Sequence, residues 1–257
     1  IVERMKLFHP DEILYVVDKR QELHFIQVFR CARKTGLVEA DTRLSFLGFG
    51  TMNGKDGKPF KTREGGVMRL ENLIADIDEE MFTKIVENRS VRDKDARDTA
   101  KIVGMAAIKY GDLSNQATKD YIFDVDRFTS FEGNTGPYIL YTIVRIKSIL
   151  NRYVEEGGNL DAGELLPASN GSEKNLMLQL SGFGSMIESA YEEKAPHKIC
   201  AYIYEVSNAF NSFYHETKIL SEENQAQKES YIRLLQLTKR VLETSIDLLG
   251  FEAPDKM

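Results

Sequence analysis

The chain has 257 residues, of which 42% are hydrophobic and 29% charged, and its net charge at pH 7 is −6. These shares are ordinary for a globular protein of one or two domains. No apolar run approaches the roughly 20 residues of a membrane-spanning helix, so we expect no membrane contact. Cys31 and Cys200 lie far apart without metal-ligand spacing, which argues against a disulfide framework and predicts a cytoplasmic protein with two small buried thiols.

The charge is distributed unevenly along the chain. Residues 1–130 carry equal numbers of basic and acidic side chains, whereas residues 131–257 account for the whole net charge of −6. An acidic half attracts a polyanion poorly, so general electrostatic binding of nucleic acid is a poor hypothesis. Any contact with RNA needs a local basic stripe together with aromatic stacking.

The first segment has the pattern of a parallel βαβ unit. Glu12–Val17 and Leu44–Phe49 are short apolar runs typical of strands, and we expect them to pair as parallel neighbours. Residues 21–34 between them have a helical period through Leu23, Ile26 (or Gln27) and Arg30.

The middle of the chain becomes helical. We expect a short strand at Met68–Leu70, a helix that begins at Glu71 and runs to Ile85, and further helical structure from about residue 92 to Gly111. Tyr121–Phe128 alternates in character and predicts a strand rather than a helix.

Residues 131–257 predict a helical bundle. Thr135 can cap a helix with Pro137 in its first turn. A stripe at helical spacing follows and should be buried: Ile139, Ile143, Ile146 and Leu150. A Gly/Asn/Asp-rich break at 157–172 is the clearest linker. Further helices are expected at Leu176–Tyr191, Pro196–Phe213 and Gln225–Leu249.

The stretch from Gly48 to Gly66 holds six glycines and four basic residues. Glycines bring backbone N–H groups close to a ligand, and lysine and arginine supply charge for phosphates. The loop lacks the Gly-x-x-x-x-Gly-Lys-Ser/Thr spacing of a P-loop. Composition alone favours the alternative, which is a long hairpin with a solvated basic tip.

Two further groups of side chains could bind ligands. Asp18, Gln21 and His24 follow a strand where an open α/β sheet binds its ligands, although a helix cap and a surface histidine explain them equally well. Farther along, two helical stripes combine tyrosine with arginine or asparagine, as base stacking requires. Composition favours core packing for these residues, which are Tyr138, Tyr141 and Arg145 on one helix and Tyr204 and Asn208 on another.

Three ordered segments resemble bacterial arginyl-tRNA synthetases, which belong to class I. Gly54-Lys-Asp-Gly-Lys-Pro-Phe-Lys-Thr-Arg is similar to the loop that stands in that family where other class I synthetases carry KMSKS. Tyr15–His24 resembles the family's strand and helix start beside the amino-acid and adenosine pockets. Asn134–Arg145 resembles the start of its anticodon-binding domain, and Leu249–Met257 resembles its end.

The resemblance implies an α/β part followed by an all-α part. Residues 1–130 would be the second half of a Rossmann-like catalytic domain, with the KMSKS-like loop and a region that contacts the tRNA stem, and residues 131–257 would be an anticodon-binding bundle. The parent enzyme would join arginine to its tRNA with ATP, whose counter-ion is Mg²⁺. We expect no tightly bound cofactor, no protein-bound metal and a monomer.

The resemblance also assigns roles to residues. In the loop, Lys61, Arg63 and Lys58 would stabilise the leaving pyrophosphate. Beside the strand, Gln21 would bind the guanidinium group of arginine, and His24 and Asp18 would lie at the substrate pocket. Anticodon contacts map onto six positions: Tyr138, Tyr141, Arg145, Tyr204, Asn208 and the final Met257.

One departure from the family bears on activity. Class I synthetases need a His-x-Gly-His motif, and no two of the four histidines here lie close together. We therefore expect the chain to be the C-terminal portion of the enzyme and to lack adenylation activity alone. The alternative is a non-catalytic helical module, derived from a synthetase, that binds RNA or protein.

Overall fold

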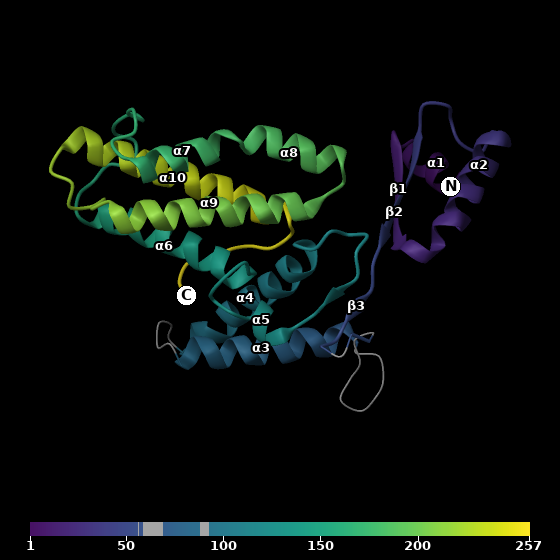
Figure 1. Ribbon diagram of the computed structural model, residues 1–257, viewed down its shortest axis with the longest axis horizontal. Helices are drawn as coiled ribbons and strands as arrows, with labels where there is room; N and C mark the ends of the chain where they lie inside the picture. Colours follow the sequence, from purple (N-terminus) through teal and green to yellow (C-terminus); the bar gives the residue numbers. More distant parts are fainter. Residues whose placement is uncertain (56, 59–68, 88–92) are drawn as a thin grey trace.

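A computed structural model describes residues 1–55, 57–58, 69–87 and 93–257 (Figure 1). The described part is mostly helical and contains two small parallel sheets. The elements in chain order are α1 (Val2–Phe8), β1 (Glu12–Asp18), a 3₁₀ turn (Lys19–Gln21), α2 (Glu22–Lys34), β2 (Arg43–Phe49), β3 (Met52–Asn53), α3 (Leu70–Glu87), α4 (Asp93–Leu113), β4 (Tyr121–Ile122), α5 (Val125–Phe128), α6 (Gly136–Glu155), α7 (Gly171–Ser181), α8 (Phe183–Glu192), α9 (Pro196–Glu216) and α10 (Gln225–Leu248).

The sheet module, defined here as residues 1–49, is built on two parallel strands. β1 pairs with β2 from Glu12 opposite Arg43 to Asp18 opposite Phe49, as the sequence predicts. The module stands at the right of Figure 1, in purple. Its buried apolar residues are Met5, Ile13, Ala32 and Val38.

The face that α2 turns toward the sheet is not the one that carries Leu23 and Ile26. Leu23 is 67% exposed, and Ile26 is also on the exposed side. Instead, Phe25 and Phe29 pack against Tyr15, with ring centroids 4.9 and 5.6 Å from the tyrosine ring. Two aromatic rings one turn apart bury more area than the leucine and isoleucine would, so they select the inward face. The same turn of the helix leaves Cys31 exposed, which corrects its prediction, whereas Cys200 is buried.

In the middle of the chain the helices are confirmed and the strands only in part. The interior side of α3 is marked by four buried residues: Leu73, Ile77, Met81 and Ile85. Leu70 begins this helix, so the short strand predicted there is wrong at that residue, and Met68 lies outside the described residues. Within 121–128 only Tyr121–Ile122 is a strand, because the chain then turns through α5 and packs the Phe128 ring 4.7 Å from that of Phe123.

Helices α6 to α10 form the bundle that the sequence predicts. Thr135 caps α6 by accepting a hydrogen bond from the Tyr138 backbone N–H at 3.2 Å. The predicted stripe of α6 is buried: Ile139, Ile143, Ile146 and Leu150. The single helix expected over 176–191 is instead two, α7 and α8, because Gly182 interrupts it with a residue of low helix propensity.

The observed fold confirms the predicted class, an α/β part followed by an all-α part. A large apolar core joins α3, α4 and the bundle from Leu73 to Phe251, separately from the small core of the sheet module. The domain division at residue 130 stays a prediction. Among the described residues, no helix has both the length and the apolar character to cross a membrane.

Candidate functional site

The predicted tyrosine stripes of α6 and α9 meet along the seam between the two helices. The rings of Tyr138 and Tyr204 lie 5.7 Å apart. The Tyr138 hydroxyl donates a hydrogen bond to Asn208 Oδ1 at 2.8 Å, which links residues 70 positions apart. The fold therefore gathers residues from both stripes into one cluster.

Two residues that the sequence analysis missed complete this cluster. Asn211 donates from Nδ2 to the Tyr138 hydroxyl at 2.8 Å and accepts from Arg145 Nη1 at 2.9 Å. The Arg145 guanidinium lies over the Tyr141 ring at 4.7 Å and near the Tyr214 ring at 5.2 Å. The sequence contains a signal for both residues, because Asn211 and Tyr214 continue the stripe of Tyr204 and Asn208 at helical spacing. We call these seven residues the tyrosine cluster: Tyr138, Tyr141, Arg145, Tyr204, Asn208, Asn211 and Tyr214.

The tyrosine cluster has an inner and an outer part. Tyr138 and Tyr204 are half-buried against the core, and burial raises the pKa of Tyr138, so its hydroxyl stays neutral. Tyr141 and Tyr214 are 43% and 38% exposed and flank the guanidinium of Arg145. The interior thus holds the polar groups in place, while the surface offers aromatic faces beside a positive charge. Such a surface can stack nucleic-acid bases.

The residues after β1 lie at its carboxyl end, as the sequence predicts. The Asp18 carboxylate accepts hydrogen bonds from the Arg20 backbone N–H at 2.8 Å and from Arg20 Nε at 2.9 Å. These bonds lower the pKa of Asp18 to about 2. Asp18 therefore caps the turn, which is the structural alternative left open above, while Gln21 and His24 are exposed on the first turns that follow. Their substrate roles stay predictions.

The glycine–basic loop is described only at its start. Gly54 donates its backbone N–H to the Lys58 carbonyl oxygen at 2.8 Å, and Gly57 adopts a left-handed φ of 71° that suits glycine. Lys55 is ion-paired with Asp124 at 3.0 Å and Asp126 at 2.8 Å. Lys61 and Arg63 lie outside the described residues, so the expected roles of Lys58, Lys61 and Arg63 are not tested.

Comparison with known proteins identifies the family. Residues 1–125 match the family model "tRNA synthetases class I (R), catalytic domain", and residues 139–257 match "DALR anticodon binding domain". The arginine–tRNA ligase of Agathobacter rectalis is 65% identical over all of this chain, and that of Alkaliphilus oremlandii is 57% identical. The chain belongs to the arginyl-tRNA synthetase family.

The structural comparison agrees with this family. The arginyl-tRNA synthetase of Thermus thermophilus matches 96% of this chain with a TM-score of 0.83 at 25% identity. This chain spans 44% of the length of both bacterial ligases and 41% of the Thermus protein.

The last predicted site residue is Met257. It is half-buried against the large core, at the end of the segment that follows α10. Lys147 of α6 holds this segment by donating to the carbonyl oxygens of Ala253 at 3.4 Å and Pro254 at 3.3 Å. The segment therefore lies along α6, and a contact of Met257 with RNA stays a prediction.

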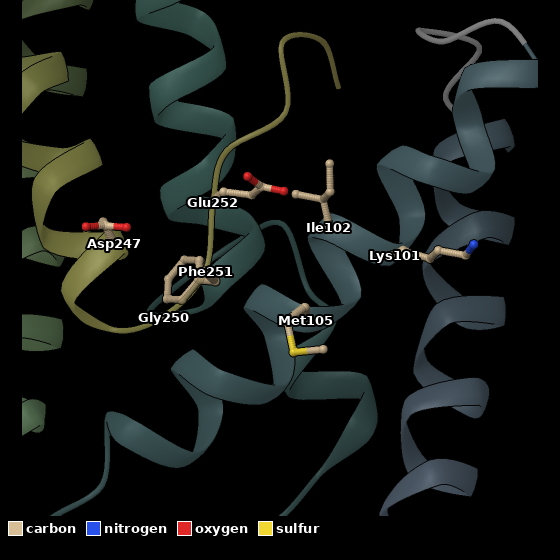
Figure 2. A pocket seen from close by; sticks show the side chains of 7 residues that line it. All are labelled: Lys101, Ile102, Met105, Asp247, Gly250, Phe251 and Glu252. Atoms are coloured by element: carbon tan, nitrogen blue, oxygen red, sulfur yellow. The ribbon is translucent and has the colours of Figure 1, made fainter.

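A cavity between α4 and the same segment is separate from the candidate site (Figure 2). Its volume is about 450 Å³, and Lys109 of α4 donates a hydrogen bond to the Gly250 carbonyl oxygen nearby. None of the predicted site residues is among those that line it, which are Lys101, Ile102, Met105, Asp247, Gly250, Phe251 and Glu252. This cavity therefore lies apart from the tyrosine cluster.

Proposed function

We propose that this chain is part of an enzyme that activates arginine with ATP and transfers it to its tRNA. The tyrosine cluster carries this proposal, because its exposed rings and guanidinium are supported by a bonded interior in a chain of the arginyl-tRNA synthetase family. In this proposal residues 1–130 belong to the catalytic domain and residues 131–257 recognise the anticodon. The protein would act as a cytoplasmic monomer.

The chemistry requires positioning and charge more than acid–base catalysis. The carboxylate of arginine attacks the α-phosphorus of ATP in line, the bond to the β-phosphate oxygen breaks, and pyrophosphate leaves with its Mg²⁺. Lys61, Arg63 and Lys58 would neutralise the charge that develops on the pyrophosphate. Gln21 would bind the guanidinium group of the substrate, with His24 and Asp18 near the nucleotide.

RNA recognition would depend on local contacts, because the helical half is net acidic. Unstacked anticodon bases would lie on the exposed rings of Tyr141 and Tyr214, with Arg145 between them as the local cation. Tyr138, Tyr204 and Asn208 would shape the inner wall, and Met257 would contribute from the end of the chain. Stacking supplies about 1–3 kcal/mol per base.

Binding of an arginine tRNA anticodon stem-loop to this chain tests the RNA part of the proposal. Tyr141→Ala and Tyr214→Ala each remove one exposed stacking ring and should each weaken binding by about one to two powers of ten. Tyr191→Ala is a matched control, because Tyr191 lies on α8 outside the cluster and is 73% exposed. It should leave the affinity unchanged.

Three outcomes would contradict the RNA assignment. One is unchanged affinity in both cluster variants, and another is equal binding of stem-loops with unrelated anticodons. The third is loss of the folded state in both variants, as measured by circular dichroism. That result would show that these tyrosines are core residues.

A chimera tests the catalytic part. In it, this chain replaces the matching 44% of the Agathobacter rectalis ligase. The chimera should catalyse arginine-dependent exchange between ATP and pyrophosphate, and Lys61→Ala should lower kcat more than it raises KM for arginine, because the charge it meets develops in the transition state. An inactive, folded chimera that still binds the stem-loop would favour the non-catalytic module.

A further inference from the structure

Residues 117–126 lie against the start of the glycine–basic loop. The backbone N–H of Gly50 donates to the Ala117 carbonyl oxygen at 2.8 Å, and that of Phe123 donates to Asn53 at the same distance. Between them β3 and β4 pair in parallel. The chain entering the loop is therefore hydrogen-bonded to a segment roughly 70 residues later in the sequence.

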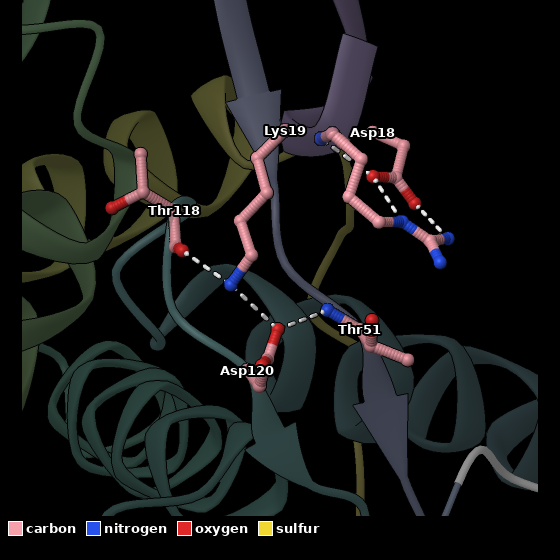
Figure 3. A network of polar contacts seen from close by, with 6 residues as sticks. Asp18, Lys19, Thr51, Thr118 and Asp120 are labelled. Atoms are coloured by element: carbon pink, nitrogen blue, oxygen red, sulfur yellow. Dashed lines mark hydrogen bonds and ion pairs between the residues drawn. The ribbon is translucent and has the colours of Figure 1, made fainter. Parts of the chain in front are cut away.

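One carboxylate joins this ladder to the end of β1 (Figure 3). Asp120 Oδ1 accepts a hydrogen bond from the Thr51 backbone N–H at 2.7 Å and another from Lys19 Nζ at 2.9 Å. Lys19 also donates to the Thr118 carbonyl oxygen at 3.3 Å. Thus Asp120 connects the residue after Asp18 with the residue at the root of the loop.

Close backbone contacts at two glycines just before Thr51 keep these three segments in register. A Cβ on Gly50 would lie 2.3 Å from the carbonyl oxygen of Lys119, and one on Gly48 would lie 2.8 Å from the Cα of Lys19. Only glycine permits such approaches. The position of Asp120 relative to both partners is therefore set by backbone packing as well as by its own bonds.

The same segment holds the loop at a second point. Lys55 pairs with Asp124 and Asp126 beyond β4. Lys55 and Asp126 are largely solvated, so the ion pair between these two is individually weak. A lysine held there is directed toward α5 instead of toward a phosphate. The loop is thus tethered to residues 117–126 before and after β3.

We propose that Asp120 is a positioning residue, which sets the start of the loop relative to the turn after β1 that carries Gln21. This inference rests on the proposed function, because the tether made by Asp120 would orient the loop lysines and Gln21 toward each other. Asp120 itself would touch no reacting atom. A displacement of about 1 Å between two such groups lowers a rate by up to about 100-fold, so a tether at this point affects kcat.

Hydrogen exchange in this chain tests the tether without any assay of activity. Asp120→Ala should raise the amide exchange rate of Thr51 and its neighbours about tenfold, which is the effect of one charge-assisted hydrogen bond. Asp120→Asn should have a smaller effect, since its amide oxygen still accepts from Thr51. Glu79→Gln is the matched control, because it removes an exposed ion pair with Arg97 at 3.2 Å elsewhere.

Activity of the chimera tests the consequence of the tether. Asp120→Ala should lower kcat for ATP–pyrophosphate exchange about tenfold with little change in KM for arginine. Lys19→Met should have a similar effect, and the double variant should be no worse than Asp120→Ala alone, because the two residues act through one contact. Asp120→Asn should restore part of the rate.

The results separate this inference from the proposed function. An unchanged amide hydrogen exchange rate at Thr51 in Asp120→Ala would contradict the tether. Additive losses of kcat in the double variant, or a change confined to KM for arginine, overturn its positioning role. An inactive wild-type chimera contradicts the proposed function, and the exchange measurement still decides whether the tether exists.

Discussion

The tyrosine cluster and the end of β1 are held in place by different means. The cluster lies on helices whose opposite faces are fully buried, as at Ile143 and Ile203, and its polar groups bond one another in a half-buried seam. The end of β1 belongs to a module with four buried apolar residues and depends on exposed ion pairs such as Lys19–Asp120. A rigid core therefore preforms the proposed RNA surface, whereas backbone contacts and solvated tethers arrange the proposed catalytic side.

The largest difference should appear when equivalent core residues are shortened. Ile143→Ala in α6 leaves a cavity in the large core and should lower the free energy of unfolding by about 2–5 kcal/mol. Ile13→Ala in β1 should instead increase local opening of the sheet module. Urea unfolding with residue-resolved hydrogen exchange distinguishes these responses. A global loss of equal size in both variants would show that the module and bundle unfold as one unit.

A smaller difference should separate the polar contacts of the two regions. Asn211→Ala removes a side chain that joins Tyr138 to Arg145 and should cost about 1–2 kcal/mol of stability, because the Tyr138 hydroxyl oxygen and Arg145 each lose a hydrogen-bond partner in a half-buried seam. Asp18→Ala removes only the exposed contacts with Arg20 and should not change global unfolding. Thermal and urea denaturation measure both, and a larger effect of Asp18→Ala would reverse the comparison.

The charge of Arg145 should matter less than its shape. Arg145→Lys keeps the charge but loses the planar group between Tyr141 and Tyr214, and should cost about 0.5–1 kcal/mol of stability. Arg43→Lys is the matched change in the sheet module, where the ion pair with Glu12 leaves Arg43 66% exposed, and it should be neutral. Equal losses in the two variants would contradict a stacking role for Arg145.

As pH falls, the sheet module should lose stability before the bundle does. Hydrogen bonds from Ser45 and Arg20 lower the pKa values of Glu12 and Asp18, and the Thr51 N–H lowers that of Asp120. A carboxylate whose pKa is lower in the folded state stabilises that state at pH values above its unfolded pKa, near 4. This stabilisation is lost as pH falls toward the folded pKa. In the bundle, burial raises the pKa values of Cys200 and Tyr202 to about 12, because it favours their neutral forms. Their contribution to the free energy of unfolding is therefore lost only as pH rises.

Amide exchange at pH 3 and pH 6, corrected for intrinsic rates, measures this smallest effect. Protection should fall at residues 12–18 and 43–53 while the buried amides of α6 and α9 keep theirs. Equal loss in both regions at pH 3 would contradict the assignment of acid sensitivity to Glu12, Asp18 and Asp120.

Much of the fold follows from short-range patterns in the sequence. The apolar runs predict the parallel pairing of β1 with β2, and the helical spacing from Ile139 to Leu150 predicts the buried stripe of α6. Thr135 and Pro137 mark the start of that helix in the same way. These features depend on neighbours within a few residues, because periodicity and capping are properties of a single element.

The tertiary structure decided which side chains meet. Nothing local to α2 selects Phe25 and Phe29 over Leu23 for the inward face, because that choice depends on the ring of Tyr15 in β1. Asn211 likewise joins the tyrosine cluster only once α9 packs beside α6. Asp120 acquires its bonds to Thr51 and Lys19 across 69 and 101 residues. Such contacts depend on how complete elements pack, so the sequence by itself determined the elements and the family, and the packing determined the partners.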